Sequence, residues 1–134
     1  MKKHLAIFSK EHTEDLFSGK KEAELRISQK RIAPFGVLNV GDLVYIKPSG
    51  GDVIGQFSIK KVISFEAPDK KDWEIIANLS NPTSKVSTAS IPPRRWSLSK
   101  VKFVTLIFMD QIEKFITSPI KIKKGDSRAW VVLD

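Results

Sequence analysis

The chain has 134 residues, of which 41% are hydrophobic and 28% charged, and it contains no cysteine. This length fits one compact domain over residues 1–134, and the lack of cysteine excludes disulfides, cysteine-ligated zinc and a thiol nucleophile. Lys and Arg number 23 against 15 Asp and Glu, so the formal net charge is +8. Such a charge attracts polyanions, most often nucleic acid; the alternative interpretation is a basic surface that only keeps the protein soluble.

The N-terminal segment is predicted to form a strand, a helix and a glycine stop. An apolar run covers residues 4–8, Ser9 can cap a helix over residues 10–18, and Gly19 follows. The apolar run is too short for a signal peptide, and no stretch is long enough to cross a bilayer. We therefore expect a cytoplasmic protein that makes no contact with membranes.

Residues that follow the glycine alternate in polarity. Ala23, Leu25 and Ile27 are apolar, whereas Glu24 and Arg26 between them are charged. This period of two is typical of a strand with one face in the core. The charged face is either an exposed surface or part of a binding site.

The central segment is predicted to be a β-hairpin followed by a helix. Strands over residues 43–47 and 53–65 flank the turn sequence PSGG, and Gly55 marks a bend or bulge where the sheet curls. Apolar residues recur at helical spacing within residues 69–80. The Ser-, Thr- and Pro-rich stretch over residues 81–100 is predicted to be a surface loop.

The C-terminal segment completes the sheet. We expect strands over residues 101–109 and 111–116, a basic connection over residues 118–128 and a terminal strand over residues 129–133. The whole pattern of six or seven short strands and two helices predicts an α+β, mainly β fold. We expect a small mixed or antiparallel β-barrel with the helices packed at its openings.

Several large side chains lie in apolar patterns and are predicted core residues. They are Trp73, Phe103, Leu106, Phe108 and Trp130. Burial of such side chains accounts for much of the stability of a domain this size.

Familiar catalytic and metal-binding motifs are absent from the sequence. The two histidines, His4 and His12, lack the spacing of a zinc motif, and neither a P-loop, a G-x-G-x-x-G fingerprint nor a G-x-S-x-G elbow occurs. We therefore expect no metal ion and no cofactor.

Two stretches, AIFSKEHTEDLFSGKKEAELR and PFGVLNVGDLVYIKPSGGDVIGQFSIKKVISF, resemble the first half of ASCH domains, which belong to the PUA-like superfamily. ASCH domains open with a strand and a helix, continue into a motif of the form G-x-K-x-x-E-x-R, and reach a G-D turn before two barrel strands. Here the motif reads Gly19, Lys21, Glu24 and Arg26, and the turn falls at residues 41–42. The resemblance implies a single PUA-like barrel of the ASCH type.

The resemblance also implies a module that binds RNA or a nucleotide in a cleft between the barrel and the first helix, and it places Lys21, Glu24 and Arg26 there. Arg26 could fork onto a phosphate or a base edge, Lys21 would supply a mobile positive charge, and Glu24 could accept from an exocyclic amine. The alternative is an exposed strand on which Glu24 and Arg26 form a surface ion pair of little energetic value.

Further candidate ligand contacts lie outside the motif. Backbone donors near Ser9 and in the PSGG turn could bind an anion, and a loop combines two cations with an aromatic ring that could stack on a base. These candidates are Ser9, Ser49, Gly50, Arg94, Arg95 and Trp96. Helix capping, an ordinary hairpin turn and packing of the loop against the barrel are the corresponding structural alternatives.

Two other functions remain open at this point. Some ASCH-like proteins look like enzymes that act on RNA or modified nucleosides; a metal-independent hydrolase of this kind would use Glu24 as general base and Lys21 to stabilise negative charge. The amidohydrolase-like branch has a threonine nucleophile where this chain has Glu24, so that activity is not carried over. The second open function is a protein-interaction module that docks an acidic partner on its basic surface. The sequence leaves the choice among RNA, DNA and a free nucleotide open, together with the oligomeric state.

Overall fold

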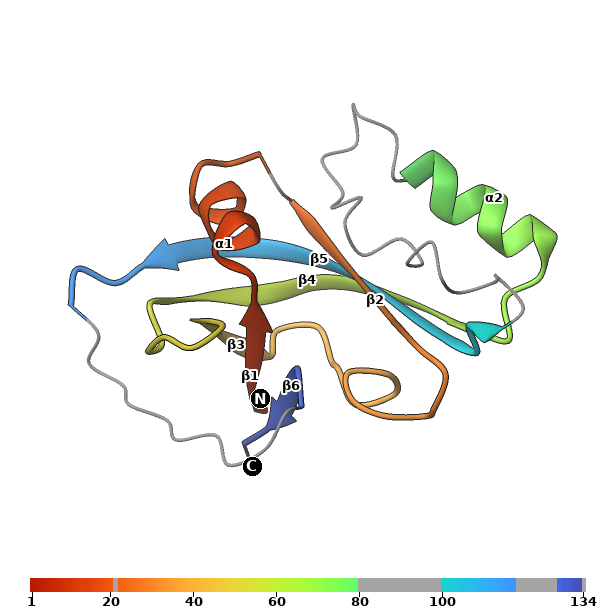
Figure 1. Cartoon of the computed structure of the whole chain (residues 1–134), viewed down its shortest axis with the longest axis horizontal. Coiled ribbons are helices and arrows are strands. Elements are labelled where there is room, and N and C mark those ends of the chain that lie inside the picture. Colours follow the sequence, from red (N-terminus) through yellow and green to blue (C-terminus); the bar gives the residue numbers. More distant parts are fainter. Residues whose placement is uncertain (21, 80–99, 118–127, 134) are drawn as a thin grey trace.

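The computed structural model of the chain describes residues 1–20, 22–79, 100–117 and 128–133. In chain order the elements are β1 (Lys3–Phe8), α1 (Lys10–Phe17), β2 (Ala23–Ser28), β3 (Leu43–Pro48), β4 (Gly55–Glu66), α2 (Lys70–Leu79), β5 (Phe103–Lys114) and β6 (Trp130–Val132) (Figure 1). The predicted mainly β fold with two helices is confirmed. Neither helix in this described part of the chain is long and apolar enough to span a membrane.

The six strands form one mixed sheet in the order β2-β5-β4-β3-β1-β6. Strands β1 and β3 run parallel, with α1, β2 and the loop after β2 between them in the chain, and all other pairs are antiparallel. The sheet curls into a partly open barrel, with β2 crossing over β4 and β5 in the view of Figure 1. Strands β2 and β6 form the two edges of the sheet.

Strand β5 differs from the expectation of two separate strands. It runs unbroken from Phe103 to Lys114, and Gln111 adopts a positive φ of 51° within it. The pairing of β4 with β5 shifts register between Gln56 and Ser58 and again between Ile59 and Lys61. These irregularities let two long strands bend together, so the curl predicted for β4 is present a few residues after Gly55.

Gly55 lies at a close approach between α1 and the sheet. A Cβ atom built at this position would lie 2.5 Å from the Glu113 carbonyl oxygen and 2.6 Å from Cζ of Phe17. Only glycine fits where the aromatic ring of Phe17 packs over β4 and β5. Gly55 therefore lets α1 pack closely against the sheet.

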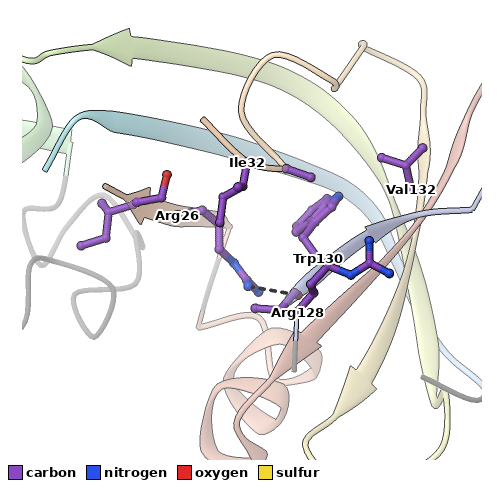
Figure 2. A pocket seen from close by; sticks show the side chains of 9 residues that line it. Arg26, Ile32, Arg128, Trp130 and Val132 are labelled. Atoms are coloured by element: carbon purple, nitrogen blue, oxygen red, sulfur yellow. Dashed lines mark hydrogen bonds between the residues drawn. The ribbon is translucent and has the colours of Figure 1, made fainter. Parts of the chain in front are cut away.

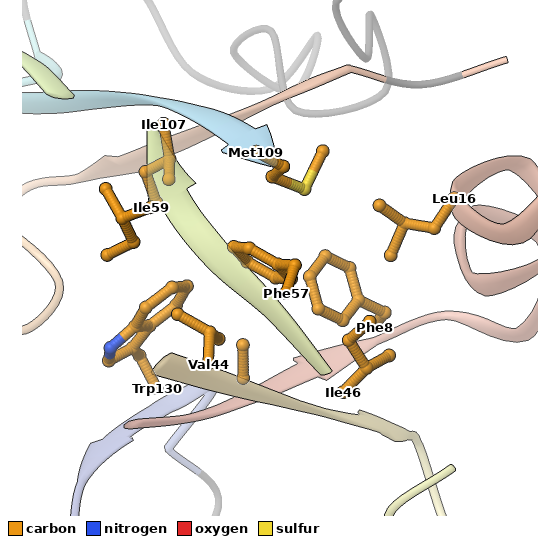
Figure 3. Close-up of a cluster of buried hydrophobic side chains, with 10 residues drawn as sticks. Phe8, Leu16, Val44, Ile46, Phe57, Ile59, Ile107, Met109 and Trp130 are labelled. Atoms are coloured by element: carbon orange, nitrogen blue, oxygen red, sulfur yellow. The ribbon is translucent and has the colours of Figure 1, made fainter. Parts of the chain in front are cut away.

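The core consists of two main clusters of side chains, one on each side of β2 and β5. The larger cluster fills the barrel beneath α1 and includes Phe8, Leu16, Val44, Ile46, Phe57, Ile59, Ile107, Met109 and Trp130 (Figure 3). The second joins β2 and β5 to α2 and includes Ala23, Leu25, Ile76, Val104 and Leu106. Burial of Leu106 and Trp130 is confirmed, while Trp73, Phe103 and Phe108 are partly buried.

Candidate functional site

The polar face of β2 points into the barrel. Glu24 is 1% exposed, and the Arg26 side chain is 16% exposed. Ala23 and Leu25 on the opposite face pack against the cluster that includes α2. The alternation in the sequence therefore marks two buried faces of β2, one apolar and one charged, and the surface ion pair is excluded as an interpretation of Glu24 and Arg26.

Arg26 links β2 to strands with which β2 does not pair. Its Nη2 donates to the Ile7 carbonyl at 2.9 Å, and its Nη1 donates to the Ala129 carbonyl at 3.4 Å. The guanidinium also lies 5.0 Å from the ring centroid of Phe8 and 5.4 Å from that of Trp130, within range of a cation–π interaction. Within the described part of the chain, its buried Nε has no hydrogen-bond acceptor.

Glu24 and Arg26 form a long ion pair. The distance from Glu24 Oε2 to Arg26 Nη2 is 3.9 Å, which is too long for a hydrogen bond. Coulomb attraction still acts at this distance, and it is stronger than in water because both side chains are largely buried. The glutamate therefore offsets part of the charge that Arg26 brings into the barrel.

Arg26 lines a pocket of about 400 Å³, called here the Arg26 pocket (Figure 2). Its walls come from the end of β2, the loop after it and the segment that enters β6. The lining residues are Arg26, Ile27, Ser28, Ile32, Ala33, Arg128, Ala129, Trp130 and Val132. Among the residues that the structure describes, the lining holds two arginines and no carboxylate, so the pocket favours an anion.

The predicted site residues fall in several places. Arg26 lines the Arg26 pocket, whereas Glu24 is not part of its lining. Lys21 and the loop residues Arg94, Arg95 and Trp96 lie outside the described residues. The predicted cleft beside the first helix stays a prediction, because its lysine is among them.

Ser9 and the PSGG turn lie next to each other at the end of β1. Ser9 caps α1, since its hydroxyl accepts from the His12 N–H at 3.2 Å. The Ser49 N–H donates to the Phe8 carbonyl at 2.8 Å, and Gly50 sits at the exposed tip of the turn with a φ of 77°. The capping and hairpin roles are thus present, and two of the turn's backbone donors, the N–H groups of Ser49 and Gly51, are already bonded within the protein.

A buried hydrogen-bond network that sequence reasoning missed supports one wall of the Arg26 pocket. Trp130 Nε1 donates to His4 Nδ1 at 3.3 Å, and His4 Nε2 lies 2.9 Å from Asp42 Oδ2. An indole N–H can only donate, so His4 Nδ1 must be unprotonated and Nε2 must carry the proton. His4 is therefore the neutral tautomer in this arrangement, donating to Asp42 and accepting from Trp130.

Asp42 anchors this network at the G-D turn. Burial is the largest influence on its pKa and raises it, but the hydrogen bond from His4 and those from the Lys2 and Asn39 N–H groups together outweigh burial. The pKa of Asp42 therefore lies below its usual 3.8. The two backbone bonds are both 3.0 Å long, and they tie the first residues of the chain to the turn before β3.

A weak signal for this network exists in the sequence. His4 is a polar residue at the start of an apolar strand, and a polar side chain in such a strand suggests a buried hydrogen-bond partner. The partner, Asp42, lies 38 positions away and has no local sequence signature. Among the described residues, no cluster of three or more His, Asp or Glu side chains is arranged to hold a metal ion.

The mixed, partly open barrel with a helix after β1 is the fold of solved ASCH proteins. Solved structures place the chain in this fold: a serine-to-alanine variant of the ASCH protein from Zymomonas mobilis superposes with a TM-score of 0.64 at 14% identity, over 99% of this chain and 89% of that one. A tyrosine-to-phenylalanine variant of the same protein gives a TM-score of 0.56 at 14% identity, over 85% of this chain and 73% of that one.

A third solved structure, hypothetical protein PH0355, has a TM-score of 0.51 at 19% identity, over 86% of this chain and all 100% of that one. No protein-family model and no curated protein matches the sequence. At these identities the likeness defines the fold, and the ASCH-type barrel expected from the resemblance is confirmed.

Proposed function

We propose that the chain binds RNA or a nucleotide, with the Arg26 pocket as part of the binding site. The observation that carries this proposal is the pocket's lining, which combines Arg26 and Arg128 with apolar side chains and, within the described part of the chain, contains no carboxylate. A nucleotide has the matching chemistry, because it joins a negatively charged phosphate to a flat, largely apolar base. The ASCH-type fold and the net charge of +8 support the same class of ligand.

The two arginines have different roles in this proposal. Arg128 is exposed at the rim, where its guanidinium can reach a phosphate. Arg26 already donates to the carbonyls of Ile7 and Ala129, so it supplies a fixed, largely buried positive charge to the pocket. Lys21, next to β2 in the chain, adds a mobile cation, and Glu24 limits the net charge of the interior.

The test is a fluorescence titration of the protein with a short single-stranded RNA, DNA of the same sequence and a panel of mononucleotides. We expect wild type to bind at least one of these ligands and the Lys21→Ala/Arg26→Ala variant to lose that binding. Arg128→Ala removes a rim cation and should weaken binding about threefold to tenfold, the effect of one ordinary hydrogen bond, because water screens a contact at an exposed position.

Circular dichroism and thermal unfolding of each variant separate loss of binding from loss of fold. Equal affinity of wild type and the folded variants would mean that the basic surface acts without the Arg26 pocket, and it would contradict the proposal. The same result would favour the protein-interaction alternative, in which the pocket plays no part.

A further inference from the structure

The loop after β2 extends the Arg26 pocket toward a third cation. A second hollow, of about 270 Å³, is lined by Ile27, Ser28, Gln29, Lys30 and Ile32. Three of these residues, Ile27, Ser28 and Ile32, also line the Arg26 pocket, so the two hollows adjoin around the end of β2. We call the two hollows together the β2–β6 groove.

The backbone of the loop is held in place at Lys30. The Ser28 hydroxyl donates to the Lys30 carbonyl at 2.7 Å, and the Ile32 N–H donates to the same oxygen at 2.9 Å. Arg31 turns away from the groove and pairs with Glu66 at 3.2 Å. Lys30 is therefore the cation that this loop contributes to the groove, on a backbone that two hydrogen bonds fix.

Charge along the groove has one sign. Arg26 and Arg128 line the larger hollow and Lys30 lines the smaller one, and the described residues that line the two hollows include no Asp or Glu. The same lining has an apolar wall, to which Ile27, Ile32, Ala33 and Val132 contribute. A ligand that matches the groove carries negative charges at intervals with apolar groups between them.

We propose that the β2–β6 groove binds a single-stranded phosphodiester chain with at least two phosphates, one near Arg26 and Arg128 and one near Lys30. This inference rests on the proposed function and narrows it from a nucleotide or RNA to a strand. A free mononucleotide could occupy the Arg26 end only. A duplex keeps its bases stacked inside, so it could not place a base against the apolar wall of the groove, whereas an unpaired strand can.

The experiment compares ligands of increasing length on three proteins: wild type, Lys30→Ala and the control Lys60→Ala. Lys60 is an exposed lysine of β4 that lines neither hollow. Lys60→Ala therefore lowers the net charge by the same amount as Lys30→Ala and leaves the lining of the groove unchanged. Anisotropy of a labelled RNA tetranucleotide gives its dissociation constant, and competition gives that of a nucleoside monophosphate. A blunt-ended RNA duplex, with its concentration expressed per phosphate, serves as the structured competitor.

We expect wild type to bind the tetranucleotide more tightly than the monophosphate or the duplex. Lys30→Ala should weaken tetranucleotide binding about threefold to tenfold and leave the monophosphate unchanged, because only the longer ligand reaches Lys30. Lys60→Ala should bind both ligands as wild type does, apart from a small loss common to any removed charge.

Each other outcome counts against the inference. Equal affinity for monophosphate and tetranucleotide, tighter binding of the duplex, or equal effects of Lys30→Ala and Lys60→Ala would overturn it while leaving a nucleotide-binding function in place. Failure of wild type to bind any of the ligands would overturn the proposed function, and the inference with it.

Discussion

Arg26 joins parts of the barrel that share no strand pairing. Its side chain spans from β2 to the carbonyls of Ile7 and Ala129 and packs against the rings of Phe8 and Trp130. Arg26→Ala would leave both carbonyls without this donor and remove both cation–aromatic contacts. We expect the free energy of unfolding, measured in urea, to fall by about 2–4 kcal/mol.

Arg26→Lys separates this structural role from the role in binding. A lysine keeps the positive charge but cannot reach two carbonyls as a guanidinium fork does. We expect Arg26→Lys to lower the free energy of unfolding as Arg26→Ala does. Arg26→Ala should also weaken RNA binding by more than about 1 kcal/mol, whereas Arg26→Lys should retain more of the affinity. Wild-type stability in Arg26→Ala would show that the two carbonyl bonds contribute nothing, contrary to this view.

Asp42 gives the stability of the protein a defined dependence on pH. Because its pKa is lowered in the folded state from the usual 3.8, the unfolded chain takes up the proton first as pH falls. Its contribution is complete above pH 3.8 and is lost as pH falls through the lower folded-state value. Urea unfolding of wild type and Asp42→Asn, from about pH 6 down to about pH 2, measures this contribution.

We expect wild type to be more stable than Asp42→Asn near neutral pH, because the carboxylate accepts from His4 and from the backbone of Lys2 and Asn39. The difference between the two proteins should shrink below about pH 4, as protonation removes the charge that the variant already lacks. A constant difference over the whole range would assign the acid sensitivity to other carboxylates.

Helix α1 offers a test at the level of one element. Ser9 accepts from the His12 N–H, so Ser9→Ala should lower the free energy of unfolding by about 0.5–2 kcal/mol. Ser9→Asp is the matched control, because aspartate caps helices as well as serine does but repels an anion. Ser9→Asp should be as stable as wild type in thermal unfolding. If Ser9 contacts a phosphate, Ser9→Asp will bind RNA more weakly than wild type; unchanged RNA binding would mean that Ser9 only caps the helix.

Local patterns predict most of the elements, and tertiary contacts explain the exceptions. The strand at residues 4–8, the Ser9-capped helix and the hairpin around PSGG follow from apolar periodicity and turn chemistry, which act over a few residues. Strand β5 runs through the break expected near Asp110 because its long partner β4 supplies hydrogen bonds on both sides of Gln111. A pairing partner that lies tens of residues away leaves no local signal.

The candidate site likewise has features that local patterns predict and features that depend on tertiary contacts. The alternation of β2 placed Glu24 and Arg26 on one face, but it could not show that this face is buried, since burial depends on the curl of the whole sheet. The sequence indicates Arg128 only as part of a basic segment before the terminal strand. Its place on the pocket rim depends on β6 pairing with β1, a contact between the two ends of the chain.

At the scale of the whole molecule, the net charge of +8 and the cations of the β2–β6 groove act at different distances. The overall charge attracts a polyanion from solution and is screened by salt beyond roughly 8 Å at physiological ionic strength. The groove acts at contact, where each phosphate replaces counterions. The salt dependence of the association constant therefore measures how many phosphates the protein neutralises, whereas the substitutions show where those phosphates bind.

We expect the logarithm of the RNA association constant to fall linearly with the logarithm of the salt concentration, with a slope of about −0.7 for each phosphate contacted. Two bound phosphates would give a slope near −1.4, and Lys30→Ala should reduce it toward the value for one. The measurement is a titration of the tetranucleotide at several concentrations of KCl, with an uncharged nucleoside as the control ligand. A slope near zero for the tetranucleotide would mean that apolar contact with bases, and not phosphate binding, holds the strand, and the three cations of the β2–β6 groove would then have no part in affinity.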